Sequence, residues 1–278
     1  FASALGYEPI EIDVLDNDTD PDLDPLRVIL LDTEDTNGVA YINAADSLVS
    51  YAAIPGFAGA DSFDYVVTDC LGGSDTARVL INVVAPPSVW RVPEDSPTIA
   101  GALALASPGD TVKVACGTYR ESEITLPPGV TLTSESEDPD CVVIDASGRA
   151  GRALYCADAD STTVLSGISV TGGYSDQQGG GLLCVRSSIR AIDCTFEGNT
   201  ADAGGGVACD DSSNVVFTGC RIGGNSASAG GGVLCSNGSS PSFIGCSIAD
   251  NVASLAGGAV ECSSSSTPRF ESCTFAGN

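Results

Sequence analysis

The chain has 278 residues, with 11 Lys or Arg against 37 Asp or Glu, so its formal net charge is −26. It contains no histidine and a single lysine, Lys113. We expect no nucleic-acid partner, because phosphate binding needs clustered basic side chains. Anionic membrane surfaces are disfavoured for the same reason, and no apolar run approaches the roughly 20 residues needed to span a bilayer.

Residues 1–85 are expected to form a small antiparallel β-sandwich of the Ig-like type. Short runs rich in β-branched and aromatic residues alternate there with turn-rich pieces, as in sandwiches of short strands. The expected strands are Glu8–Leu15, Leu26–Leu31, Val39–Ile42, Leu48–Ala52, Asp61–Thr68 and Ala77–Val84.

An acidic loop, DNDTDPDLDP at residues 16–25, separates the first two expected strands. Carboxylates recur there at alternate positions: Asp16, Asp18, Asp20, Asp22 and Asp24. Calcium takes several oxygen ligands from a loop that can fold around it, so we predict a structural Ca²⁺ site. The alternative is a solvated turn rich in Asp and Pro. The spacing is not that of an EF-hand, which needs Gly at its sixth position and Glu at its twelfth.

This unit resembles the cadherin-like and Ig-like tandem repeats of bacterial surface proteins. The resemblance rests on VLDNDTDPDLDPLRV (14–28), FAGADSFDYVVTD (57–69) and TARVLINV (76–83). It implies a calcium-stabilised spacer of the kind found in adhesins, with Asp69 as a further ligand. Cys70 stands where those repeats usually have glycine, so a disulfide from Cys70 is possible.

A short linker, residues 86–91, is expected before a helix at about 97–106. Ser96 is a suitable N-cap and Pro97 a suitable first helical residue. Ile99, Leu103 and Ala106 would share one face, which would cover the open end of a coil of strands. The pattern PTI…AL…A…PGDTV.V..GTY resembles the N-terminal cap of right-handed β-helix proteins of the pectate-lyase-like class.

Residues 179–278 repeat one pattern four times with a period of about 26 residues. Each copy has a glycine-rich start, two cysteines, a closing asparagine and three short apolar patches with period-two alternation. Such units bury an inner face only when they are stacked. We therefore predict a right-handed parallel β-helix over residues 92–278. A leucine-rich solenoid is the rival at this period, but leucine is sparse. The GG-[AG]-[LV] and [FI]-x-x-N signatures resemble the chlamydial polymorphic outer-membrane proteins and related surface β-helices.

Two sets of side chains are predicted to lie inside the coil. The closing asparagines should form a hydrogen-bonded ladder: Asn199, Asn225, Asn251 and Asn278. The cysteines of each copy should form disulfides within a rung: Cys184–Cys194, Cys209–Cys220, Cys235–Cys246 and Cys262–Cys273. The alternative is two columns of buried free thiols. Three pairings are open for Cys70, Cys116, Cys141 and Cys156.

The twelve cysteines indicate an oxidising compartment, so we expect a secreted or cell-surface protein.

Sugar cleavage would need paired carboxylates on an outer face. The outward positions of the first strand in each copy read Leu183, Ala208, Leu234 and Glu261, which gives no pair. We expect a non-catalytic, structural or adhesive β-helical stalk or extracellular filament component. Its partners would be further copies in a fibre, or a glycan or protein of a host or cell surface. The alternative is a polysaccharide lyase or hydrolase, or a glycan-binding β-helix. The chain ends at the close of a rung, so we expect further rungs or a covering subunit there.

Overall fold

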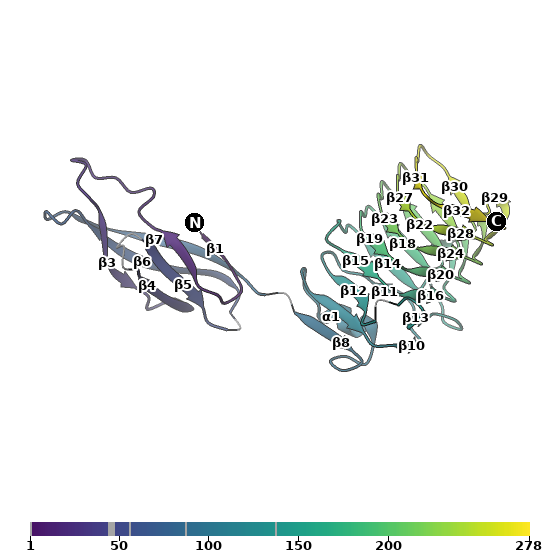
Figure 1. The fold of residues 1–278 in the computed structure, drawn as a ribbon, viewed down its shortest axis with the longest axis horizontal. Coiled ribbons are helices and arrows are strands. Elements are labelled where there is room, and N and C mark those ends of the chain that lie inside the picture. The colour runs from purple at the N-terminus through teal and green to yellow at the C-terminus, as the bar shows by residue number, and fades with distance from the viewer. Residues whose placement is uncertain (1, 44–47, 56, 87, 137) are drawn as a thin grey trace. The chain divides into compact units, whose positions relative to one another are not determined.

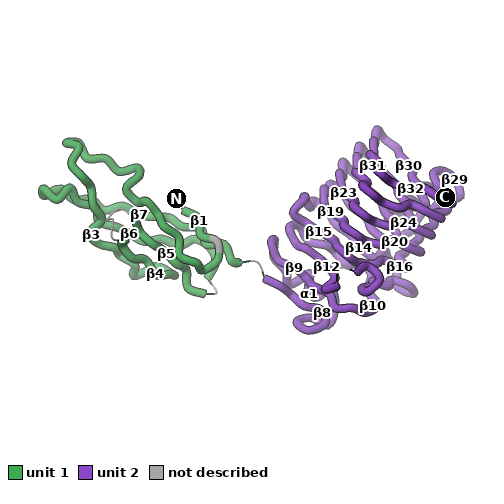
Figure 2. Tube along the Cα trace, viewed as in Figure 1, with its two compact units in different colours: residues 1–86 green, residues 87–278 purple. Residues whose placement is uncertain are grey.

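The computed structural model describes residues 2–43, 48–55, 57–86, 88–136 and 138–278. It divides into two compact units, Phe1–Pro86 and Pro87–Asn278 (Figures 1 and 2). In the described part of the chain, no helix is long and apolar enough to cross a membrane.

The first unit is a sandwich of two sheets, as predicted. The four-stranded sheet has the order β1 (Ala2–Leu5), β7 (Ser74–Val84), β6 (Gly59–Thr68), β3 (Arg27–Asp32). The three-stranded sheet has the order β2 (Ile10–Asp13), β5 (Leu48–Ala53), β4 (Gly38–Ile42). All pairings are antiparallel except β1 with β7, which is parallel. β1 lies outside the strands predicted from the sequence.

Alternation along β6 explains the core of the first unit. Phe63, Tyr65 and Val67 point inward and are buried, while the residues between them are partly exposed. On the outer face, the Arg78 guanidinium forms a bidentate pair with Asp64, with 2.7 Å between Nε and Oδ1. Period-two burial of this kind fixes the register, since a slip by one residue would turn the aromatic side chains to solvent.

The second unit is a parallel β-helix made of four sheets, each built from one strand per rung (Figure 1). The first sheet contains β8 (Val89–Val92), β9 (Thr111–Val114), β12 (Thr131–Ser134), β15 (Val164–Ser166), β19 (Arg190–Ile192), β23 (Val216–Thr218), β27 (Ser242–Ile244) and β31 (Arg269–Glu271). The second contains β10 (Gly117–Tyr119), β13 (Val142–Asp145), β16 (Ser169–Thr171), β20 (Thr195–Glu197), β24 (Arg221–Gly223), β28 (Ser247–Ala249) and β32 (Thr274–Ala276).

The third sheet contains β11 (Ile124–Thr125), β14 (Leu154–Ala157), β18 (Leu182–Val185), β22 (Val207–Asp210), β26 (Val233–Cys235) and β30 (Val260–Cys262). The fourth contains β17 (Tyr174–Gln178), β21 (Thr200–Ala203), β25 (Ser226–Ala229) and β29 (Val252–Ala256). A regular rung therefore has four strands, one more than the three apolar patches of each repeat indicate. The fourth strand is made of small residues such as TADA and SASA, whose pattern is too weakly apolar to mark a strand.

Rungs pair in register, so like residues lie above like. Phe217 pairs with Phe243 and Phe243 with Phe270, and their rings stack with centroids 4.7 and 4.9 Å apart. The rings belong to one continuous apolar core that also contains the aliphatic side chains of the irregular early rungs. Stacking identical side chains keeps the cross-section constant from rung to rung.

The solenoid begins earlier than predicted. β8 pairs with β9, so residues 89–91 belong to the solenoid and not to a linker; Pro87 lies outside the described residues. Asp110 stabilises this first part of the solenoid. Its carboxylate accepts the Ser88 N–H at 2.7 Å, the Ser107 N–H at 2.9 Å and the Trp90 indole N–H at 3.1 Å.

The capping helix α1 spans Ile99–Leu105, within the predicted range, and packs Ile99, Ala102 and Leu103 into the solenoid core. Its N-cap is Thr98 and not Ser96, since Thr98 Oγ1 accepts the Gly101 N–H at 3.1 Å. The Glu121 carboxylate accepts the free N–H groups of Ile99 and Ala100 at 2.8 and 2.9 Å. Side-chain oxygens thus satisfy the orphan donors of the first turn.

Candidate functional site

The asparagine ladder (Asn199, Asn225, Asn251 and Asn278) runs through the turn between the second and fourth sheets. Asn225 Oδ1 accepts both the backbone N–H of Asn199 at 2.9 Å and its Nδ2 at 3.1 Å. Asn251 serves Asn225 in the same way at 3.1 and 2.9 Å, and Asn278 serves Asn251 at 3.1 and 2.8 Å. The first three side chains are fully buried. Buried amides are stable there because they are bonded on both sides.

The glycine-rich starts of the repeats make room for this ladder. A Cβ on Gly206 would lie 2.7 Å from the carbonyl oxygen of Gly232 and 2.8 Å from Nδ2 of Asn225. Gly204 has φ of +68°, a conformation that residues with a side chain rarely adopt. The repeated glycines thus serve close backbone approach beside the asparagines.

A second ladder, made of serines, was not predicted from the sequence. The backbone N–H of Ser187 donates to Oγ of Ser213 at 3.0 Å, that of Ser213 to Ser239 at 3.0 Å, and that of Ser239 to Ser266 at 3.1 Å. Ser187, Ser213 and Ser239 are fully buried. These serines recur at the repeat spacing, and this recurrence is the sequence signal for the ladder.

The cysteines lie in two columns and not in pairs across a rung. The first cysteine column is Cys156, Cys184, Cys209, Cys235 and Cys262, in register along the third sheet. The second cysteine column is Cys194, Cys220, Cys246 and Cys273, at the start of the second-sheet strands. All nine are free thiols, so the four predicted within-rung disulfides are absent and that prediction was wrong.

The within-rung disulfides are absent because the strands of neighbouring rungs pair in register. Each cysteine has its nearest counterpart directly above or below it, one rung away, because in-register parallel strands repeat every 4.8 Å or so. Cys116 and Cys141 form the one disulfide among the described residues, while Cys70 is an exposed free thiol.

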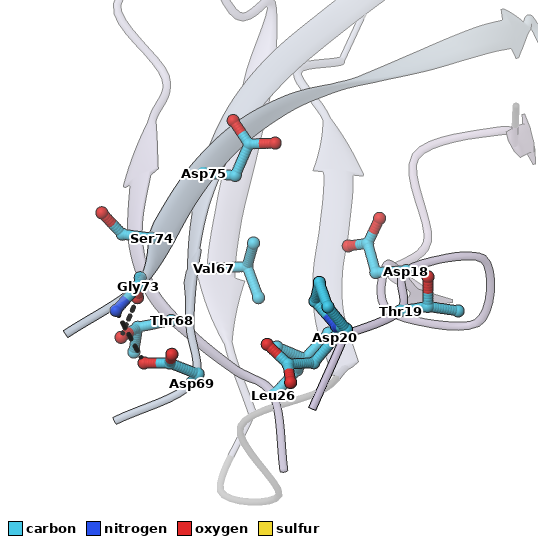
Figure 3. A pocket seen from close by; sticks show the side chains of 11 residues that line it. Asp18, Thr19, Asp20, Leu26, Val67, Thr68, Asp69, Gly73, Ser74 and Asp75 are labelled. Carbon is cyan, nitrogen blue, oxygen red and sulfur yellow. Dashed lines mark hydrogen bonds between the residues drawn. The ribbon is translucent and has the colours of Figure 1, made fainter. Parts of the chain in front are cut away.

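The predicted calcium ligands of the first unit are only partly brought together. Asp18, Asp20 and Asp69 line one pocket of about 250 Å³, which Asp75 also lines (Figure 3). Three other residues of the predicted set do not line it: Asp16, Asp22 and Asp24. In the described ranges, no three Asp, Glu or Cys side chains lie close enough to hold a metal ion. The conformation therefore does not present a ready-made calcium site.

All four pocket carboxylates already accept hydrogen bonds. The Tyr65 hydroxyl donates to Asp18 Oδ2 at 2.8 Å, and the Thr76 N–H donates to Asp75 Oδ1 at 2.7 Å. Asp69 Oδ1 accepts the N–H groups of Leu71, Gly72 and Gly73 at 2.7 to 2.9 Å, and these bonds, that from Leu71 first, lower the pKa of Asp69. Asp20 Oδ1 accepts the N–H groups of Asp22 and Asp24 at 2.8 and 3.1 Å. Asp20 and Asp69 each keep one oxygen, Oδ2, for which no bond is seen among the described residues.

The outer face of the third sheet is less open than predicted. Leu183, Ala208 and Leu234 are buried there in a small apolar cluster, with Tyr155, Val185 and Ala203 packed against it. Beside this cluster lies a hollow of about 470 Å³ whose polar lining comes from three carboxylates and two carboxamides: Asp176, Gln177, Gln178, Asp202 and Asp210. Side-chain oxygens and amides of this kind can hydrogen-bond hydroxyl-rich ligands.

Surface charges also join rungs. Arg186 pairs with Asp158 on one side, 2.7 Å from Nε to Oδ1, and with Asp211 on the other, 3.1 Å from Nη1 to Oδ2. These turn residues lie in three consecutive rungs. The two ion pairs connect the three rungs at the surface, although each exposed pair contributes little to stability.

Comparison with known families agrees with this architecture. The model for the right-handed β-helix region matches residues 131–278, which is more than half of the chain, and the bacterial Ig domain model matches residues 3–82. The chain belongs to the right-handed β-helix family, with a bacterial Ig domain preceding the solenoid. No curated protein and no solved structure matched the chain. A bacterial Ig domain followed by a β-helix is typical of surface or structural proteins.

Proposed function

We propose that the chain is a non-catalytic, structural or adhesive element of the cell exterior, most simply an adhesin stalk. The observation that carries this proposal is that the repeated residues contact their equivalents in neighbouring rungs. The asparagines, serines and core phenylalanines that recur from rung to rung bond or stack with their own counterparts. A repeat whose recurring residues serve stacking adds length in steps of about 4.8 Å per rung.

The outward side chains support the same proposal. At one outer position of the third sheet the rungs carry Leu183, Ala208, Leu234 and Glu261 in turn, so this position does not repeat. The Ig domain adds a module of the spacer type, and the Cys116–Cys141 disulfide fits an oxidising exterior. A filament subunit is the second form of this proposal, and sedimentation of the purified chain distinguishes a monomeric stalk from a fibre.

The test of the proposal is a polysaccharide screen. The purified chain is incubated with acidic and neutral polysaccharides, with and without calcium, beside a known polysaccharide lyase. The proposal expects no reducing or unsaturated sugar ends above the protein-free blank. Release at catalytic rates, repeated with independent preparations, would contradict it and favour a lyase or hydrolase.

Glycan binding without cleavage is a second candidate, and the hollow beside the third sheet favours it. Its three carboxylates and two carboxamides offer hydrogen-bond partners for sugar hydroxyls next to the apolar Leu183. Retention of the chain on immobilised glycans would then weaken in Asp202→Asn. The matched control is Asp140→Asn, which removes the same charge from an exposed site outside the hollow. Equal retention of both variants would contradict binding at the hollow.

A further inference from the structure

The first cysteine column brings thiols of neighbouring rungs into contact. Cys156 pairs in register with Cys184, and their sulfur atoms lie 3.0 Å apart. A disulfide bond is about 2.05 Å long, so the two sulfurs are separated by about 1 Å more than a covalent bond requires. Both side chains are fully buried. The sulfurs therefore face each other without solvent or another side chain between them.

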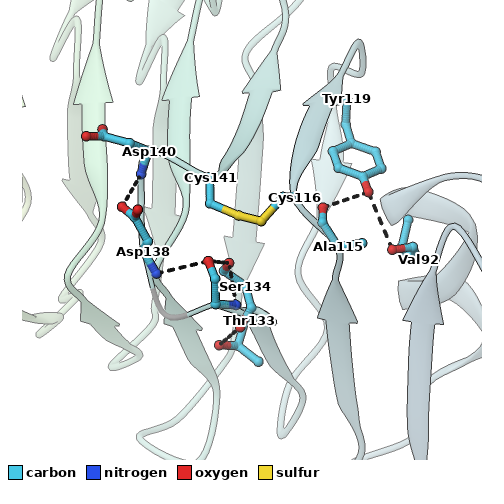
Figure 4. Close-up of a disulfide and its surroundings, with 10 residues drawn as sticks. Val92, Ala115, Cys116, Tyr119, Thr133, Ser134, Asp138, Asp140 and Cys141 are labelled. Atoms are coloured by element: carbon cyan, nitrogen blue, oxygen red, sulfur yellow. Dashed lines mark hydrogen bonds between the residues drawn. A yellow bond between two sulfur atoms is a disulfide. The ribbon is translucent and has the colours of Figure 1, made fainter.

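The molecule already contains a disulfide between neighbouring rungs. Cys116 and Cys141 are joined with 4.8 Å between their Cα atoms (Figure 4). They directly precede the in-register pair Gly117 and Val142 of β10 and β13. This separation falls within the usual 4.4–6.8 Å for disulfides. The rung-to-rung spacing of this solenoid can therefore be bridged by a disulfide.

We propose that Cys156 and Cys184 form a disulfide between consecutive rungs when the chain folds in the presence of a disulfide oxidant. Two thiols lose two protons and two electrons, and one S–S bond forms. The electrons reduce the oxidant, a small or protein disulfide, to two thiols. The exchange passes through a mixed disulfide between one cysteine and the oxidant, which the second cysteine then resolves.

The burial of the two thiols determines when this bond forms. Burial raises the pKa of Cys184, and the hydrogen bond with Cys156 raises it further. The thiolate is the reactive form, so the buried pair reacts slowly once the rungs have closed over it. The disulfide therefore forms during folding, while the thiols are still in contact with water.

The first cysteine column also explains why we expect Cys184 to be joined to Cys156 and not to Cys194 of its own rung. Cys194, the within-rung candidate for Cys184, belongs to the second cysteine column, where its Sγ lies against the carbonyl oxygens of Leu165 and Ile192 at 3.5 and 3.2 Å. Cys209, the next thiol in the first column, pairs in register with both Cys184 and Cys235. The sulfur of Cys184 has its 3.0 Å contact with Cys156, and this contact favours the Cys156–Cys184 pair.

The experiment is oxidative refolding followed by disulfide mapping. The reduced, unfolded chain is refolded with oxidised and reduced glutathione, quenched in acid, alkylated without reduction and cleaved before aspartates. This cleavage separates the competing cysteines, because aspartates lie between Cys156, Cys184, Cys194 and Cys209 in turn: Asp158, Asp176, Asp193 and Asp202. We expect peptides linked through Cys156–Cys184 to contain most of the recovered Cys184, together with Cys116–Cys141.

Three results would overturn the proposal: Cys184 linked to Cys194, Cys184 linked to Cys209, or alkylated Cys156 and Cys184 in chains that contain Cys116–Cys141. Cys194→Ala is the matched control. It removes the within-rung candidate and should leave the Cys156–Cys184 link at its wild-type yield, whereas a within-rung bond would disappear. The oxidant is supplied in the experiment, so the result does not depend on the proposed function.

Discussion

Asn225 accepts two hydrogen bonds from Asn199, one from the backbone N–H and one from the side-chain amide, at 2.9 and 3.1 Å. Its own Nδ2 donates to the carbonyl oxygen of Phe196 and to Oδ1 of Asn251. One buried side chain thus links three successive rungs through hydrogen bonds to both neighbours. The arrangement satisfies every polar atom of an amide that is completely removed from water.

Asn225→Ala should lower the free energy of unfolding of the solenoid by about 1–3 kcal/mol, because two donors of Asn199 lose their acceptor in a buried site. Chemical denaturation monitored by circular dichroism measures the change. The control is Asn214→Ala, at an exposed position of the same rung, which should cost less. Equal effects of the two substitutions would argue against the ladder as a stabilising feature.

Gly206→Ala should destabilise the solenoid by about 1–3 kcal/mol, the usual cost of overpacking a tight interior. The new Cβ would meet Gly232 O at 2.7 Å and Asn225 Nδ2 at 2.8 Å. Gly223→Ala is the control, since its Cβ would come no closer than 3.3 Å to Ala249 O and its φ is not in the left-handed region. Thermal melting compares the two, and a Gly206 variant as stable as the Gly223 variant contradicts the steric explanation.

The buried pair Tyr51–Asp61 should make the stability of the first unit depend on pH. Burial acts to raise the pKa of Asp61, but hydrogen bonds from Tyr51 and Asn37 outweigh it and hold the pKa below its usual value of 3.8. A lowered pKa in the folded state means that the stabilisation is complete above the unfolded value and is lost as the pH falls through the folded value.

Melting temperatures of the first unit in wild type and Asp61→Asn, measured from pH 7 down to about pH 2, test this linkage. The wild type should be the more stable at neutral pH, and its advantage should shrink below about pH 4. A constant difference across that range would show that Asp61 does not titrate in this way.

Calcium binding by the first unit is tested by ligand linkage. A ligand that binds only the folded state raises the melting temperature as its concentration rises. We expect calcium to raise the melting temperature of the first unit and EDTA to reverse the effect, since binding would draw the pocket carboxylates together. Asp18→Asn combined with Asp75→Asn should abolish the shift, while Asp22→Asn, outside the pocket, should retain it. A transition unmoved by calcium and EDTA would contradict the prediction.

The sequence predicted the architecture well because the repeat period is visible in each of the four regular copies between residues 179 and 278. It placed cysteines and asparagines inside the coil, since Cys209 and Val207 alternate with their neighbours in a strand. It failed where the outcome depends on contacts between rungs. The partner of Cys184 is Cys156, from an irregular rung whose register no period marks. The strands Thr200–Ala203 and Ser226–Ala229 carry too few apolar residues to be recognised. Asp75 joins the acidic pocket only because β6 and β7 pair as a hairpin.

The most direct test of the central claim, that the repeats are stacking units, is deletion of one complete rung. Removal of residues 204–229 joins Ala203 to Gly230, and every strand then meets its counterpart one rung on. We expect the shortened chain to form a folded solenoid with a cooperative thermal transition by circular dichroism. Deletion of residues 204–216, about half a rung, should abolish that transition because it breaks the register. If the complete-rung deletion unfolds as the half-rung deletion does, the rungs are not interchangeable stacking units and the account is contradicted.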